Sequence, residues 1–154
     1  MPHLHLSLLG GFECRKATGE LLHFPTRKVR ALFAYLAVSA GHAHRRDKLA
    51  GLLWGDRDEA QARSNLRKAV SRLRTSLPDE VRGCLVADAG QVALRPDGIE
   101  VDVSLFARYA ADGTPEALER AAVLCRGAFL ADFADCGEEF EAWLMPERRR
   151  LDET

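Results

Sequence analysis

The stretch DEAQARSNLRKAVSRLRTSL, residues 58–77, places apolar side chains at the spacing of an α-helix. At about 100° per residue these side chains fall within a sector of about 100°, which predicts a single buried face. Asp58 is a favourable N-cap and Gln61 fits a capping box, while the Pro-Asp-Glu that follows ends the helix near Leu77. The predicted buried face consists of Ala62, Leu66, Ala69, Val70, Leu73 and Leu77.

The opposite face of this helix carries cations and hydroxyls but almost no acids. Between Asp58 and Asp79 the only acidic residue is Glu59, whereas surface helices usually interleave Glu with Lys. The planar fork of arginine suits guanine edges and phosphates, and short hydroxyl side chains let a helix approach a groove. The predicted DNA contacts on this helix are Arg63, Ser64, Arg67, Lys68, Ser71, Arg72, Arg74 and Thr75.

A basic face by itself is more often solvated than bound to a partner, so the neighbouring elements decide how it is interpreted. Two helices are predicted before it. The first follows the N-cap Thr26, runs to about Ala40 and is closed by Gly41. The second occupies residues 45–54 and has a leucine-rich face.

Three cations crowd the first turn of the first of these helices. The helix dipole disfavours positive charge at that position, and a bound phosphate would resolve the conflict. Arg27 and Lys28 are therefore predicted phosphate contacts, with a simple role in solubility as the alternative. The third cation of this turn is Arg30.

Short β-prone runs flank the helices. Residues 4–14, LHLSLLGGFEC, predict one strand broken or bulged at its glycines, with residues 20–24, ELLHF, as its partner. Residues 84–98, CLVADAGQVALRPDG, predict a hairpin around Asp-Ala-Gly. On this hairpin, Gln91 and Arg95 are predicted to reach a phosphate or the minor groove, unless the hairpin is merely exposed.

The order of small sheet, three helices and hairpin is that of a winged helix-turn-helix, with the hairpin as the wing. The predicted fold class is therefore α+β, with a winged-helix unit in residues 1–99 and an all-α segment in residues 100–154. In this setting the basic helix occupies the recognition position, which favours DNA over a solvated face.

Residues beyond the hairpin show helical patterns throughout. Helices are predicted at 102–111, at 115–126 and within 137–151, the last one interrupted or restarted near Pro146. The apolar face of the last helix has little sequence left to pack against. The two apolar stripes of this region are Leu118, Ala121, Ala122 and Cys125, and Phe140, Trp143 and Leu144.

Charge divides the chain in the same way. The 154 residues have a net charge of −1, but residues 1–98 hold 16 Lys+Arg and 10 Asp+Glu (+6), whereas residues 99–154 hold 6 and 13 (−7). The front part is suited to a polyanion and the acidic part to packing or assembly. No apolar run is long enough for a membrane span, and the N-terminus does not resemble a signal peptide, so the expected location is the cytoplasm.

The sequence offers little for catalysis or metal binding. Cys14, Cys84, Cys125 and Cys136 lack close pairing and are predicted to be buried free thiols rather than disulfide or metal partners. His-Ala-His at 42–44 has no matching second pair of ligands, so no metal is expected. Without a nucleophile–base pair or a phosphate-cradling glycine loop, neither an enzyme nor a cofactor is predicted.

Three segments resemble the front end of the SARP-type bacterial transcriptional activators. They are TRKVRALFAYLAVSAGH (26–42), RRDKLAGLLWGDRDEAQARSNLRKAVSRLR (45–74) and VDVSLFARYA (101–110). The resemblance implies an OmpR-type winged-helix domain followed by the N-terminal part of a bacterial transcriptional activator domain. It also implies that the third helix reads the major groove, that two or more copies bind direct repeats near promoters, and that the protein contacts RNA polymerase.

The chain departs from that family in three places. Val92 and Ala93 stand where the wing often has an aromatic and then a basic residue, and Arg45 stands where Ser or Thr is usual. The helical activator domain normally continues well past residue 154, so we expect a fragment of a longer regulator or a shortened relative. The alternative function is a winged-helix protein-interaction module that does not bind DNA.

Overall fold

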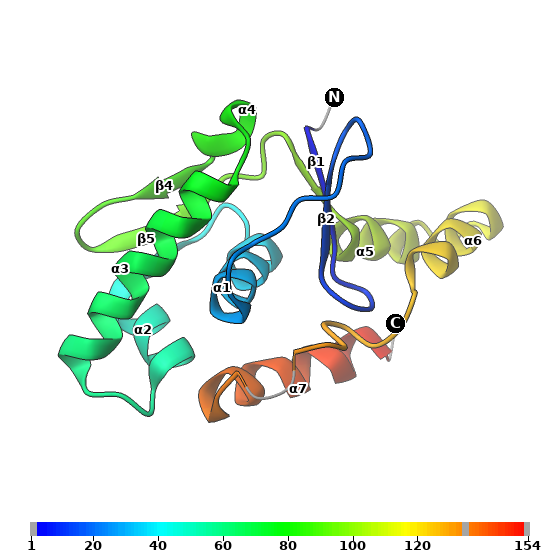
Figure 1. Cartoon of the computed structure of the whole chain (residues 1–154). Coiled ribbons are helices and arrows are strands. Elements are labelled where there is room, and N and C mark those ends of the chain that lie inside the picture. Colours follow the sequence, from blue (N-terminus) through cyan, green and yellow to red (C-terminus); the bar gives the residue numbers. More distant parts are fainter. Residues whose placement is uncertain (1–2, 134–135, 153–154) are drawn as a thin grey trace.

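Helix α1 (Arg27–Val38) runs through the middle of the molecule, between two small sheets (Figure 1). The computed structural model describes residues 3–133 and 136–152; residues 134–135 and 153–154 of the predicted all-α segment lie outside it. Every residue of α1 from Ala31 to Ala37 is buried. The fold class is α+β, as predicted.

The first sheet has the strand order β2-β1-β6. β1 (Leu4–Ser7) pairs antiparallel with β2 (Glu13–Lys16) and parallel with β6 (Ile99–Val101). The strand predicted over residues 4–14 is therefore broken at its glycines, one of the two predicted alternatives, and its two parts pair with each other. Gly10 has φ +126°, which a residue with a side chain rarely adopts, and the chain turns back between the two strands instead of bulging.

Residues 20–24 do not form the predicted partner strand. They contact β2 through one isolated bridge between Arg15 and Leu21 and through two backbone hydrogen bonds, from Lys16 N to Glu20 O and from Leu22 N to Cys14 O. The neighbouring place in the sheet, beside β1, is taken by β6. The sequence pattern misses β6 because Ile-Glu-Val is too short for a recognisable alternation.

The second sheet has the order β3-β5-β4 and contains the predicted hairpin. β4 (Leu85–Ala87) and β5 (Gln91–Leu94) pair antiparallel around residues 88–90. β3 (Ala43–Arg45) adds to β5 from the other side and was not predicted. A short helix α4 (Asp79–Arg82), also unpredicted, precedes the hairpin.

Helices α2 (Arg46–Trp54) and α3 (Glu59–Ser76) follow the sequence closely. Asp58 caps α3 by accepting a hydrogen bond from Gln61 N at 2.8 Å. The Gln61 side chain, however, donates to Asn65 Oδ1 along the helix. The predicted inner face of α3 is confirmed, since all its members are buried: Ala62, Leu66, Ala69, Val70, Leu73 and Leu77.

The first helix is capped as predicted but ends early. Thr26 Oγ1 accepts from Val29 N at 3.1 Å. The C-cap is Ser39 rather than a residue beside Gly41, because Gly41 N donates to Leu94 O and the chain already leaves toward β3.

The acidic part folds into α5 (Asp102–Asp112), α6 (Pro115–Leu124) and α7 (Glu138–Asp152). The predicted break in the last helix is wrong, since α7 continues through Pro146. A proline removes one N–H donor and leaves the carbonyl four residues earlier, at Ala142, without its partner. Both residues are exposed, so water can hydrogen-bond to that carbonyl.

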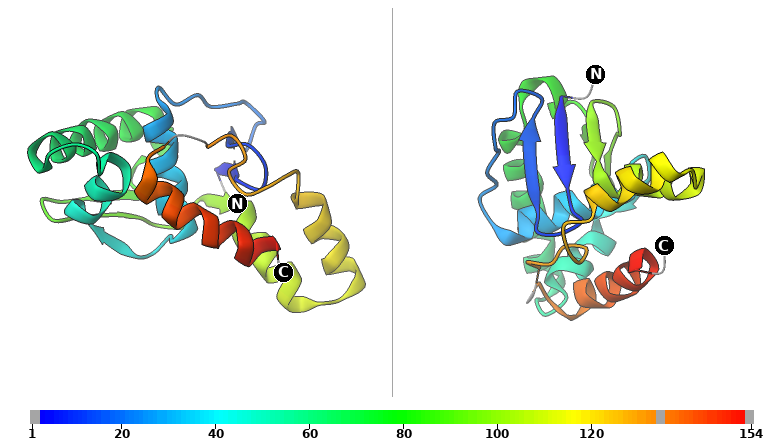
Figure 2. Two further views of the ribbon diagram at one scale, coloured as in Figure 1. Left: turned by 90° about the horizontal axis from the view of Figure 1, so that it is seen from below. Right: turned by 90° about the vertical axis from the view of Figure 1, so that its right-hand side faces the viewer.

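The apolar face of α7 finds a partner after all, because α7 packs back against α1 and α2 (Figure 2). Phe140 and Leu144 are fully buried. The Trp143 ring lies 4.9 Å from that of Tyr35 on α1, measured between centroids. The prediction that this face lacks a packing surface is therefore wrong.

A buried carboxylate joins the first sheet to α5. Asp102 accepts hydrogen bonds from Leu8 N at 2.8 Å and from Leu9 N at 2.9 Å. Burial raises the pKa of Asp102, while these backbone donors act in the opposite direction. Because β6 pairs with β1, the predicted boundary after residue 99 falls inside a paired strand.

Within residues 3–133 and 136–152, no helix is long and apolar enough to cross a membrane. In the same part of the chain no group of three or more His, Cys, Asp or Glu side chains is arranged to hold a metal ion. Cys14 and Cys136 are buried, as predicted, whereas the prediction of burial is wrong for the half-buried Cys84 and the exposed Cys125.

Candidate nucleic-acid interface

The outer face of α3 presents cations that the protein itself does not neutralise. Arg67, Lys68 and Arg72 are exposed, and within the described residues none of them forms a salt bridge. Arg63 pairs only with Glu59, at 3.7 Å between two well-exposed side chains, and such pairs contribute little. This face is available to an external anion.

A groove separates the first half of α3 from the turn of the β4–β5 hairpin. Its volume is about 600 Å³. Three arginines from two helices contribute to the lining. The lining residues are Arg46, Ala60, Arg63, Ser64, Leu66, Arg67, Asp88 and Ala89.

The predicted hydroxyl contacts differ in how far they are available. Ser71 is exposed, whereas Ser64 is half-buried and lines the groove. Thr75 Oγ1 donates to Arg72 O at 3.0 Å within the helix, so its hydroxyl proton is already engaged in a hydrogen bond. Thr75 can still accept a hydrogen bond.

Arg74 is directed into the protein. Its Nη2 donates to Leu85 O at 2.9 Å, on the first strand of the hairpin. Arg82 in turn donates to Arg74 O at 3.0 Å and to Leu77 O at 2.8 Å, at the carboxyl end of α3. The Arg74 bond fastens the hairpin to α3, and the Arg82 bonds fasten α4 to the same end of α3.

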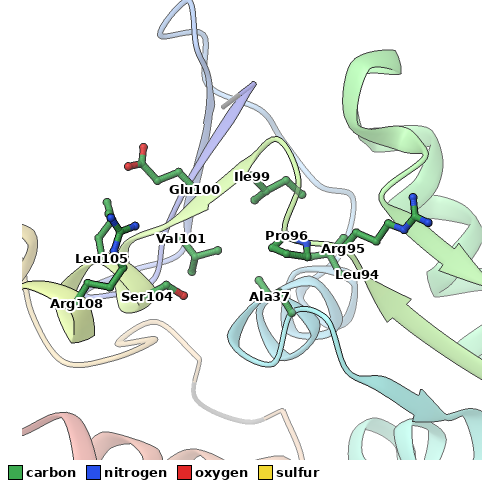
Figure 3. Close-up of a pocket in the computed structure, with 11 residues that line it drawn as sticks. Ala37, Leu94, Arg95, Pro96, Ile99, Glu100, Val101, Ser104, Leu105 and Arg108 are labelled. Atoms are coloured by element: carbon green, nitrogen blue, oxygen red, sulfur yellow. The ribbon is translucent and has the colours of Figure 1, made fainter. Parts of the chain in front are cut away.

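On the hairpin, Gln91 and Arg95 are both exposed. Gln91 opens β5, and its backbone N donates to Asp88 Oδ1. The Arg95 side chain borders a pocket of about 300 Å³ between α1 and α5 but reaches away from it (Figure 3). Both predicted residues thus lie on the surface of the hairpin side of the molecule.

In the first turn of α1, Lys28 hydrogen-bonds within the protein. Its Nζ donates to Leu53 O at the end of α2 and to Cys136 O at 2.8 Å. The ammonium also lies 5.7 Å from the centre of the Trp54 ring. These carbonyl oxygens offset the unfavourable interaction of Lys28 with the helix dipole, and burial lowers the pKa of Lys28.

The other cations of this turn are Arg27 and Arg30. Arg30 Nη1 donates to Phe24 O at 3.2 Å, just before the helix. Arg27 is exposed.

Arg46 was not predicted and lies at the centre of the interface. Its Nε donates to Asp88 O at 2.6 Å, so the first residue of α2 holds the hairpin turn. In the sequence, Arg46 is one more cation in His-Arg-Arg-Asp. Its role could not be predicted, because its hydrogen-bond partner is a backbone carbonyl 42 residues away.

Comparisons with known proteins give one informative similarity. No family model and no curated protein matches the chain. In fold, the chain is similar to EmbR. The solved structure of Mycobacterium tuberculosis EmbR in complex with a low affinity phosphopeptide superimposes with a TM-score of 0.76 and 25% identity, over 99% of this chain and 42% of that one. The similarity supports a SARP-like fold, and this chain spans less than half of EmbR.

Proposed function

We propose that this chain is a sequence-specific double-stranded DNA-binding protein that regulates transcription, of the activator type. In the proposal, residues 1–99 form an OmpR-type winged helix, and residues 100–154 begin a helical activator domain. α3 enters the major groove and the β4–β5 hairpin, as the wing, lies on the adjacent backbone or minor groove.

One observation carries the proposal: the row of unneutralised cations on α3 stands beside a hairpin that leaves that face open. A helix of about 10–12 Å diameter fits a major groove about 12 Å wide. Repulsion among these cations destabilises the folded protein, and bound phosphates remove that cost. α3 and the hairpin lie at one end of the molecule and the α5–α6 pair at the other, so DNA has free access (Figures 1 and 2).

The similarity to EmbR and the resemblance to SARP-type activators agree with this function. From the resemblance alone we further propose three partners: direct repeats near promoters, a second copy of the protein on DNA, and RNA polymerase. The proposed location is the cytoplasm, and no catalytic step is proposed.

The contact set is narrower than the sequence prediction. Arg74 and Lys28 hydrogen-bond within the protein, so we assign them to stability rather than to DNA. Arg27 stays a predicted phosphate contact. The proposed contacts on α3 and the wing are Arg63, Ser64, Arg67, Lys68, Ser71, Arg72, Thr75, Gln91 and Arg95.

The test is a fluorescence-anisotropy titration against a random duplex and against duplexes selected from a random library for binding. Wild type should prefer the selected duplexes, and its log affinity should fall with log salt at a slope of about −4 to −5 for about five phosphates. Arg67→Ala should cost roughly 5- to 150-fold on the selected duplexes and flatten the preference. Lys68→Ala should weaken both duplexes alike.

Arg120→Gln, an exposed change on α6, is the matched control and should change neither affinity. Absence of binding to any duplex at low salt would contradict the proposal. That result would favour the alternative function, a protein-interaction module whose basic face binds an acidic protein surface.

A further inference from the structure

The turn of the β4–β5 hairpin is exposed, and hydrogen bonds within it fix its conformation. Within the turn, Asp88 Oδ1 accepts from Gly90 N and from Gln91 N, both at 2.8 Å. These bonds hold the pKa of Asp88 below its usual value. They fix the local shape of the turn but not its position relative to α3.

That position is set by the first residue of α2. Arg46 N donates to Gly90 O at 3.0 Å, and Arg46 Nε donates to Asp88 O at 2.6 Å. One residue therefore binds the backbone on both sides of Ala89. At the other end of the hairpin, Arg74 binds Leu85 O, so the hairpin is fastened to the helices at both ends.

Electrostatics alone does not explain why a cation occupies this place. Arg46 lines the same groove as Arg63 and Arg67, and Asp88 is the one acidic residue of that lining. The backbone donors of the turn lower the pKa of Asp88 more than Arg46 does, and the Arg46 hydrogen bond goes to the Asp88 carbonyl oxygen, while the carboxylate accepts from Gly90 N. A neutral donor would avoid the added repulsion, whereas the guanidinium combines a directional Nε–H with further donors for the groove.

We propose that Arg46 is a positioning residue for DNA binding: it sets the separation between α3 and the wing turn before DNA arrives. The proposal rests on the function proposed above. A hairpin fixed in its bound position loses less conformational entropy on binding, and the gain appears as affinity. The base preference remains a property of the α3 side chains.

The experiment compares Arg46→Lys and Arg46→Gln, with Arg120→Gln as the matched control. Lysine keeps the charge but lacks the Nε–H in the fork. Both Arg46 variants should bind the selected duplex roughly 10-fold more weakly, because the hairpin is no longer held in its bound position before DNA binds. Arg46→Lys should keep the salt slope, and both should retain the wild-type preference between duplexes that differ in the bases under α3.

Two readouts separate positioning from a simple phosphate contact. Hydroxyl-radical footprints of both variants should lose the protection given by the wing and keep the protection given by α3. Amide hydrogen exchange at Gly90 and Gln91 should speed up in the free protein. Asp88→Ala removes the acceptor inside the turn and leaves both Arg46 hydrogen bonds to the backbone, so it should speed exchange at Gly90 and Gln91 but keep the wing footprint. Arg46→Lys serves if Arg46→Gln does not fold.

Each remaining outcome is decisive. Full binding by Arg46→Lys, together with a slope reduced by about one in Arg46→Gln and unchanged exchange at Gly90, would make Arg46 a phosphate contact and overturn the positioning role. Wild-type binding with unaffected Arg46 variants would overturn it and leave the proposed function intact. Lack of wild-type binding would overturn both.

Discussion

The outer face of α3 and the first turn of α1 carry similar cations and use them in opposite ways. On α3, Arg67, Lys68 and Arg72 are exposed and have no salt bridge within the described residues. On α1, Lys28 is half-buried and donates to two backbone carbonyls from α2 and from the segment before α7. One group of cations faces outward, and the other joins three parts of the protein.

The difference lies in what faces each helix. The first turn of α1 meets the carboxyl end of α2, where carbonyl oxygens lack helical partners and attract a cation. α3 meets other elements through its apolar face and, near its carboxyl end, through Arg74, so Arg67, Lys68 and Arg72 on the outer face stay exposed. The same residue types therefore stabilise the fold in one place and remain available to a partner in the other.

The largest expected effect concerns the α1–α2–α7 region. Phe140 is fully buried, with ring centroids 6.1 Å from Phe133 and 5.3 Å from Trp143. Phe140→Ala should lower the free energy of unfolding by about 3–5 kcal/mol, measured by urea denaturation. Met145→Ala, on the exposed side of the same helix, is the control and should change it by less than about 0.5 kcal/mol. A loss under about 1 kcal/mol for Phe140→Ala would mean that α7 does not dock in solution.

The converse change is Arg72→Glu on α3. It removes a cation and adds an anion where phosphates are expected, so affinity for the selected duplex should fall on the order of 10- to 100-fold in anisotropy titrations. Urea denaturation should show nearly unchanged stability. Arg120→Glu reverses charge on α6 and should leave both quantities unchanged. Equal losses from both reversals would point to net charge rather than to this face.

Lys28→Met tests the buried cation directly. It leaves the carbonyls of Leu53 and Cys136 without this donor, and the free energy of unfolding should fall by about 1–3 kcal/mol. DNA affinity of the folded protein should not change. Lys68→Met is the matched substitution and should behave in the reverse way, weakening DNA binding at constant stability. If Lys28→Met bound DNA more weakly while keeping its full stability, Lys28 would be a DNA contact after all.

The smallest expected effect is a pH dependence at the same lysine. Burial lowers the pKa of Lys28 from the usual 10.5, so the native state releases this proton at a lower pH than the unfolded chain does. The unfolded chain then holds more protons, and wild-type stability should rise relative to Lys28→Met as the pH is raised toward the usual lysine pKa of 10.5. Parallel urea curves along this rise in pH measure the difference. The titratable groups near this amine are Cys136, Asp56, Glu139 and Arg57.

The helices could be predicted from sequence because periodicity and capping act over neighbouring residues. The buried face of α3 and the caps at Asp58 and Thr26 were found in this way. The strands β3 and β6 were missed, since each has three residues and depends on a partner far away in the chain.

The candidate site likewise contains residues that the sequence predicts and residues whose role it does not predict. The cations on α3 follow from the helical wheel. The roles of Arg46, Arg74 and Lys28 depend on backbone carbonyls 42, 11 and 25 or 108 residues away, and no local pattern reports such partners.

The pairing of β1 with β6 has a consequence for how the chain folds as it is synthesised. Leu4 lies opposite Ile99, so the first strand stays unpaired on one edge until about a hundred residues have been made. Closing so long a loop is entropically slow, and an open strand edge invites pairing with other chains meanwhile. β1 has only four residues, and so short an open edge limits pairing with other chains until β6 has been made.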